Sequence, residues 1–141
     1  MWWRVAHRGA GSFEMPLEIT ETKTDSVILL TLKGTLEIGR DTEHLTETVL
    51  ARLGQGESKF ILDLAGVRFI DSTGISALIK IHTSAKSSAG AMKLMRLTQR
   101  VHDVLQITRL SSVFEIYNDP VKALESFRDS EAGGSGEKTK S

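Results

Sequence analysis

The chain has 141 residues, about the size of one domain, with 18 basic residues, 18 acidic residues and no cysteine. A net charge of zero argues against a surface built to bind nucleic acid, and the lack of cysteine excludes disulfides, thiolate metal sites and a cysteine nucleophile. No apolar run approaches the roughly 20 residues that span a bilayer, and residues 1–8 lack the continuous apolar segment of a secretory signal. We therefore expect a cytoplasmic protein with no membrane partner and no direct nucleic-acid partner.

The two ends differ from the body of the chain. Residues 1–14 contain both tryptophans but neither helical nor strand periodicity, which predicts a flexible leader. Residues 131–141 have no large apolar side chain and are predicted to be a disordered tail. The folded domain is expected to occupy residues 15–130, and both ends are expected to be dispensable for folding.

The first half of the body predicts a hairpin, a helix and a buried strand. Alternating or nearly continuous apolar residues indicate the strands, and apolar residues that share one face indicate the helix. In chain order we expect strand 17–20, a turn at Asp25 and Ser26, strand 27–32, a helix capped by Asp41 or Thr42 and ended by Gly54–Gly56, and strand 60–64.

The second half alternates helices with strands. Its predicted elements are a helix opened by Asp71 and Ser72 and closed by Gly90, strand 92–97, a helix from about Gln99, strand 113–117, and a helix from Asp119–Pro120 with Val121, Leu124 and Phe127 inward. This order predicts the α/β class, with a mixed, mostly parallel sheet of four to five strands packed against about four helices.

A short polar motif, Asp71-Ser72-Thr73-Gly74, joins the strand at 60–64 to the next helix. Ligands of open α/β sheets bind beyond the carboxyl ends of strands, which makes Ser72 a candidate functional residue. The N–H groups near Thr73, Gly74 and Ile75 lie at a helix N-terminus, which favours negative charge, and Asp71 could align the Ser72 hydroxyl or accept its proton. Alternatively, Asp71 or Ser72 is simply the cap of the helix. Gly74 is expected to tolerate substitution without loss of the fold, because helix geometry does not require glycine there.

This stretch, with Ile61–Leu64 before it and Ile75–Leu78 after it, resembles the STAS domain, specifically the bacterial anti-sigma factor antagonist family. The resemblance covers about Leu17 to Phe127 and includes Leu32–Glu37, which is similar to the Leu-x-Gly-x-Leu-Asp turn of that family. It implies the STAS fold and a protein that binds a partner and is not an enzyme. By resemblance Ser72 is phosphorylated, and the N–H groups near Thr73, Gly74 and Ile75 could hold that phosphate. The implied partner-binding residues are Glu37, Asp71, Ser72, Thr73, Gly74 and Ser76.

The resemblance also implies the partners. An anti-sigma factor that is a serine kinase, with ATP or ADP bound, would bind the unphosphorylated protein and release the sigma factor, which regulates transcription. A serine phosphatase would reverse the modification, and no cofactor or metal is expected. The chain departs from the family pattern at Glu37, where many relatives have aspartate, at Ile38–Arg40, where a polar run is common, and at Ser76, where some relatives have glycine. These departures bear on kinase specificity more than on the fold.

Two other functions stay open: an enzyme that uses an exposed Ser72, and a STAS scaffold that binds constitutively within a larger signalling complex. His82 lies ten residues after Ser72 on the same predicted helix, about 15 Å away, so it cannot act as a base for that hydroxyl. His82 is instead expected to be a packing residue with its polar atoms satisfied. The four histidines show no metal-ligand spacing.

Overall fold

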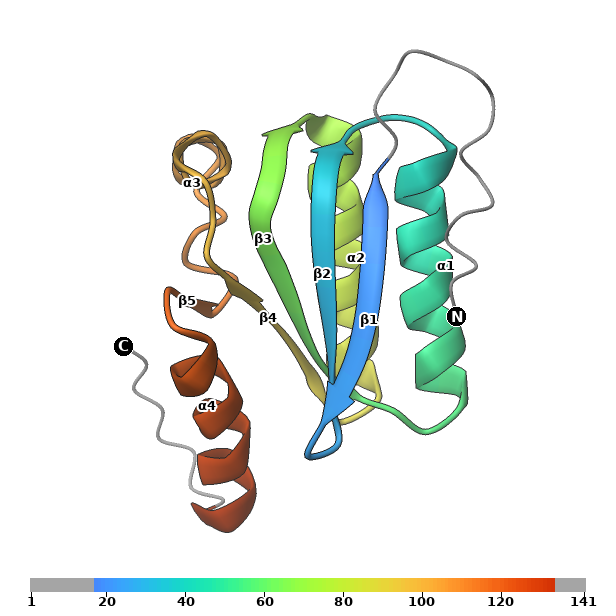
Figure 1. Cartoon of the computed structure of the whole chain (residues 1–141), viewed down its shortest axis with the longest axis vertical. Helices are drawn as coiled ribbons and strands as arrows, with labels where there is room; N and C mark the ends of the chain where they lie inside the picture. The colour runs from blue at the N-terminus through green and yellow to red at the C-terminus, as the bar shows by residue number, and fades with distance from the viewer. Residues whose placement is uncertain (1–16, 134–141) are drawn as a thin grey trace.

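The computed structural model describes residues 17–133 (Figure 1). The predicted leader, 1–14, and the last eight residues of the predicted tail, 134–141, lie outside them. The last helix runs to Gly133, three residues beyond the predicted end of the domain at 130. Between residues 17 and 133, no helix is long and apolar enough to cross a membrane.

The described residues form one five-stranded sheet and four helices (Figure 1). The strand order is β1-β2-β3-β4-β5, with β1 antiparallel to β2 and every other neighbouring pair parallel. This confirms the predicted α/β class and its mixed, mostly parallel sheet. In chain order the elements are β1 (Glu18–Thr24), β2 (Val27–Leu36), α1 (Arg40–Gly54), β3 (Lys59–Ile70), α2 (Ser72–Ser87), β4 (Ala91–Met95), α3 (Gln99–Ile107), β5 (Ile116–Tyr117) and α4 (Pro120–Gly133).

The opening hairpin turns where the sequence predicts. Asp25 and Ser26 both have positive φ, 54° and 71°, which a two-residue turn of type I′ requires. Such a turn matches the twist of the flanking strands, so it fixes the register of β1 on β2 from Glu18 opposite Lys33 to Thr24 opposite Val27.

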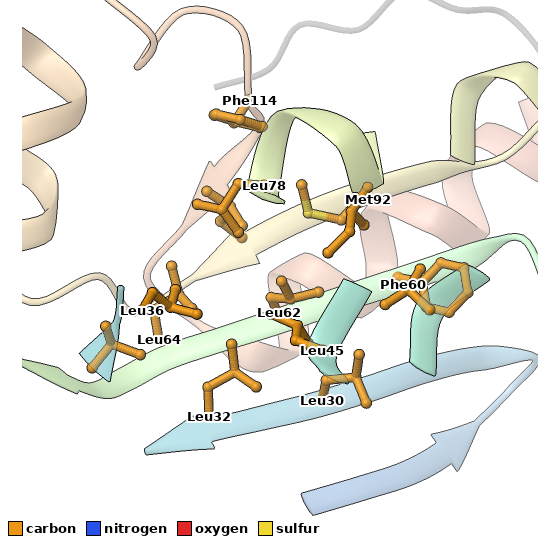
Figure 2. Packing of buried hydrophobic residues seen from close by; sticks show 14 of the residues in the cluster. Leu30, Leu32, Leu36, Leu45, Phe60, Leu62, Leu64, Leu78, Met92 and Phe114 are labelled. Atoms are coloured by element: carbon orange, nitrogen blue, oxygen red, sulfur yellow. The ribbon is translucent and has the colours of Figure 1, made fainter. Parts of the chain in front are cut away.

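Both faces of the sheet carry helices. Alternate residues of β2, β3 and β4 point toward α1 and α2 and form the main core, which Figure 2 shows around Leu30, Leu62 and Met92. The intervening residues Val27, Ile61 and Met95 face the opposite side, where Ala123 and Phe127 of α4 cover them. Strands buried on both faces explain the nearly continuous apolar runs in the sequence.

Most of the strands differ in extent from those predicted, and one helix differs in its buried face. β3 continues to Ile70, six residues past the predicted end, because it keeps pairing with β2 as far as Leu36 through two register shifts. The predicted strand at 113–117 shortens to Ile116–Tyr117. On α4, Val121 is 58% exposed and was wrongly predicted to face inward, because Ala123 and Phe127, four residues apart, define the buried face.

The predicted cap of α1 was also wrong. Gly39 is the N-cap residue of this helix, with φ 148° and no side-chain cap hydrogen bond. Asp41 and Thr42 lie inside the first turn, where they serve longer-range contacts. The Asp41 carboxylate accepts a hydrogen bond from the Leu17 N–H (3.2 Å), and the Thr42 hydroxyl donates to the carbonyl of Glu37 (2.6 Å).

Parallel pairing of β2 with β3 brings the predicted functional residues to one end of the sheet. The carboxyl ends of these two strands, Leu36 and Ile70, are paired in register. The β2–α1 and β3–α2 connections therefore leave the sheet at the same end, at the top of Figure 1. Residues far apart in the sequence, near 37 and near 72, become neighbours.

Candidate partner-binding site

Ser72 is the first residue of α2 and its side chain is exposed. It follows β3 directly, so it stands beyond the carboxyl end of a strand, as predicted. The hydroxyl is therefore open to another protein while its backbone belongs to a helix packed on the sheet.

Asp71 is the N-cap of α2, which confirms one of the two capping alternatives. Its backbone is extended, with φ −113° and ψ −171°, and its Oδ1 accepts a hydrogen bond from the Gly74 N–H (3.0 Å). Its Oδ2 accepts a second one from the Ile38 N–H (3.1 Å). Because both carboxylate oxygens already accept backbone donors, the side chain is held in place, and its geometry suits positioning better than proton transfer.

The backbone donors in the first turn of α2 differ from those expected. The Gly74 N–H is bonded to the Asp71 side chain, and the Ile75 N–H is bonded to the Asp71 carbonyl (2.9 Å). Neither is available for a phosphate. The N–H groups of Ser72 and Thr73 are the first two of the helix, which have no intrahelical acceptor.

Gly74 is buried and permits a close approach within the protein itself. A Cβ at this position would collide with the carbonyl oxygen and Cβ of Leu36 and with the side chain of Ile70. The expectation that Gly74 tolerates substitution was therefore wrong. The backbone that approaches Gly74 is that of β2.

The β2–α1 turn is joined to the β3–α2 turn by hydrogen bonds. The Leu36 carbonyl accepts one from the Asp71 N–H (3.1 Å), in addition to the bond between Asp71 and the Ile38 N–H. Glu37 lies between these anchor points with an exposed side chain, whose carboxylate accepts a hydrogen bond from the Thr35 hydroxyl (2.8 Å). Glu37 and Ser72 thus lie on one surface whose two turns are joined by hydrogen bonds.

The other predicted residues lie on α2. Thr73 is half-buried, whereas Ser76 is exposed one turn beyond Ser72, on the same side of the helix. Of the six predicted partner-binding residues, Gly74 is buried and cannot offer a side chain. The structure brings the other five together at one end of the sheet.

His82 lies away from this surface. Its ring packs edge-on against Phe114, with centroids 5.3 Å apart, which agrees with the predicted packing role. Its Nδ1, however, is buried without a hydrogen-bond partner, so the expectation of a satisfied histidine was wrong. Burial, together with the charge of Lys86, lowers the pKa of this imidazole. Among residues 17–133, no group of three or more histidine, aspartate or glutamate side chains could hold a metal ion.

Sequence reasoning missed two groups at the site, the Leu36 carbonyl and the Ile38 N–H. The signal for the Leu36 carbonyl was a glycine at the third position of α2, because the absence of a side chain permits another backbone to approach closely. The second had a weaker signal, an apolar residue in a turn between Glu37 and Gly39.

Comparison with known proteins identifies the family. The family model for the STAS domain matches residues 18–123. A Bordetella bronchiseptica protein named as an anti-sigma factor antagonist, BtrV, is 24% identical over 79% of this chain and 96% of its own length.

Solved structures agree. A crystal structure described as that of an anti-sigma factor antagonist from Thermotoga maritima has a TM-score of 0.74 and 28% identity, covering 78% of this chain and 94% of that one. The phosphorylated form of the Bacillus cell fate determinant SpoIIAA shares the fold, with a TM-score of 0.63 and 18% identity over 79% of this chain and 99% of that one. The chain described here belongs to the STAS domain family, with the fold of its anti-sigma factor antagonists.

Proposed function

We propose that this protein is an anti-sigma factor antagonist controlled by phosphorylation of Ser72. In the unphosphorylated state it binds an anti-sigma factor that is also a serine kinase, and the sigma factor is released to direct transcription. Phosphorylation ends the interaction, and a serine phosphatase restores it. The protein itself acts by binding and is not an enzyme.

The observation that carries this proposal is the position of Ser72, exposed at the N-terminus of α2 and followed by Thr73. In the transfer, Ser72 Oγ forms a bond to the γ-phosphorus of ATP, the bond to the β-phosphate oxygen breaks, and ADP leaves. The hydroxyl proton passes to a base of the kinase, because Asp71 already accepts two backbone hydrogen bonds.

A phosphate on Ser72 should affect binding to the kinase much more than it affects folding. On the free protein, a phosphate with about −1.5 to −2 charges lies beside the first N–H groups of a helix, which favour negative charge. At an interface the same phosphate must lose water next to Asp71 and Glu37, which is unfavourable unless the partner supplies cations there. Binding should weaken far more than folding.

The relatives support the same reading. BtrV and the Thermotoga maritima protein are both described as anti-sigma factor antagonists. SpoIIAA, which shares the fold, has been solved in a phosphorylated form, which supports the proposal of a phosphorylation switch.

The test combines labelling with binding. The protein is incubated with ATP and each purified histidine-kinase-like serine kinase of its own genome, and the phosphorylated residue is located by mass spectrometry. We expect labelling of Ser72, none in Ser72→Ala, and full labelling in Ser87→Ala, which removes an exposed serine at the other end of α2.

Titration calorimetry with the same kinase and ADP measures the binding affinity of each variant. Wild type and Ser72→Ala should bind equally, and Ser72→Asp should bind well below both. Equal affinity of all three, or labelling at another residue, would contradict the switch and favour the constitutive scaffold. Ester hydrolysis that disappears in Ser72→Ala would instead favour an enzyme.

A further inference from the structure

A large apolar side chain stands in solvent next to the candidate site. Ile38, in the turn between β2 and α1, is 76% exposed. Among the large hydrophobic residues in the described part of the chain, Ile107 is the one with a higher exposed fraction, 81%, and it is the last residue of α3. Single exposed apolar residues are common, so the exposure of Ile38 alone indicates nothing.

The backbone around Ile38 is fixed on both sides. Its own N–H donates to Asp71 Oδ2 (3.1 Å), and the carbonyl of Glu37 accepts a hydrogen bond from the Thr42 hydroxyl (2.6 Å). The Gly39 carbonyl accepts one from the Glu43 N–H (3.3 Å). The apolar side chain is therefore presented by an ordered turn, and binding a partner would cost little additional backbone entropy.

Asp71 connects this turn to the phosphorylation site. The same carboxylate that bonds the Ile38 N–H caps the helix whose first residue is Ser72. The Asp71 side chain therefore holds the Ile38 turn at a fixed position relative to Ser72. The neighbours Glu37 and Arg40 are exposed and polar, and so form a hydrated rim beside the apolar group.

We infer that Ile38 is the apolar anchor of the surface around Ser72, and that Asp71 is the positioning residue that holds it there. The partner it fits is a protein with an apolar pocket next to the groups that receive Ser72. This inference rests on the proposed function, which makes that partner the anti-sigma serine kinase. In a complex, an apolar side chain that the partner buries, surrounded by polar groups that exclude water, is the usual arrangement of an interface hot spot.

The first test measures binding to the kinase that labels Ser72, by calorimetry with ADP. Ile38→Thr keeps the branched Cβ and adds no charge, and we expect it to weaken binding by about tenfold or more. Ile38→Val should restore most of the affinity, and Ile107→Thr, the matched exposed isoleucine, should bind like wild type. Circular dichroism should show unchanged melting for all three variants.

The outcomes separate this inference from the proposed function. If wild type is labelled on Ser72 and Ile38→Thr binds equally well, the anchor is refuted and the switch stands. If wild type neither binds nor is labelled by any of the kinases, both fail. If sedimentation shows that wild type self-associates and Ile38→Thr abolishes this, the anchor serves a second copy of the chain and the inference is overturned.

A second test needs no partner. Asp71→Asn has one acceptor oxygen, whereas the carboxylate has two. Because asparagine is a good N-cap residue, we expect its oxygen to accept from the Gly74 N–H, which leaves the Ile38 N–H without an acceptor. By NMR, the amide proton of Ile38 should exchange with solvent about tenfold faster or more in this variant, while that of Gly74 stays protected. Unchanged exchange at Ile38 would refute the positioning role of Asp71.

Discussion

Asp71 accepts a hydrogen bond from the backbone of Ile38, which lies 33 residues earlier in the sequence, at 3.1 Å. Because the same carboxylate caps α2 through Gly74, one side chain stabilises a helix terminus and also fixes a turn that belongs to another pair of elements. Helix capping and the geometry of the candidate interface therefore depend on the same residue.

Replacing Asp71 by alanine should cost more than an ordinary cap. Both the Gly74 and Ile38 donors lose their acceptor, and we expect the free energy of unfolding to fall by about 1–3 kcal/mol. Urea denaturation measures the change. Asp103→Ala on α3 is the control, because its exposed carboxylate accepts a hydrogen bond from Gln99, and it should change stability by no more than about 0.5 kcal/mol. Equal effects of the two changes would contradict the dual role of Asp71.

Gly74→Ala should destabilise the fold. The added methyl group meets the backbone of Leu36, which cannot move without disturbing β2, so we expect a loss of about 1–3 kcal/mol by denaturant titration. Gly54→Ala, at the end of α1, is the control: a Cβ there has no heavy atom within 4 Å, and stability should be unchanged or slightly higher. A Gly74→Ala protein as stable as wild type would show that the two turns can separate.

His82 should make stability depend on pH. Its pKa is lowered in the folded protein by burial and by Lys86, so the unfolded chain binds a proton more readily. Stability is then highest above the unfolded pKa of about 6.5 and is lost as the pH falls through the lower folded value. His82→Leu should flatten this slope between pH 7 and pH 5. Denaturant titrations at several pH values test this, and a slope that survives the substitution would assign the dependence to other groups.

Ser72→Asp should leave folding almost unchanged. A carboxylate at the first position of α2 is favoured by the helix dipole but lies beside Asp71, so the two effects oppose each other. We expect a change in unfolding free energy within about 0.5 kcal/mol, alongside the large loss of kinase affinity proposed above. If Ser72→Asp unfolds readily, its loss of kinase affinity would be explained by loss of the fold and not by the added charge.

Lys93 is a buried lysine whose charge we expect to be dispensable for stability. Its Nζ lies 2.8 Å from the Ser126 hydroxyl, 3.2 Å from Glu115 and 4.1 Å from the centre of the Phe127 ring. Because Glu115 is half-exposed and can return to water, Lys93→Met should be neutral or slightly stabilising in a thermal melt. Phe127→Ala should cost about 3–5 kcal/mol. A large loss in Lys93→Met would instead show that α4 depends on the charge.

The sequence alone determined which segments become strands and which become helices. Strand and helix periodicity depends on residues that are close together along the chain. The hairpin turn at Asp25 and Ser26 and the cap at Asp71 depend on such local residues as well. These features need no knowledge of what the segment packs against. The position of Ser72 at a strand-to-helix connection followed from the same local signals.

The tertiary structure decided which partners those segments meet. Parallel pairing of β2 with β3 brings Leu36 beside Gly74 and Ile38 beside Asp71, and no local pattern encodes that pairing. The same long-range packing took Asp41 and Thr42 away from capping and left Val121 in solvent. Periodicity specifies that a residue faces inward or outward within its own element, whereas contacts between elements depend on register and on the path of the connecting turns, which only the folded chain fixes.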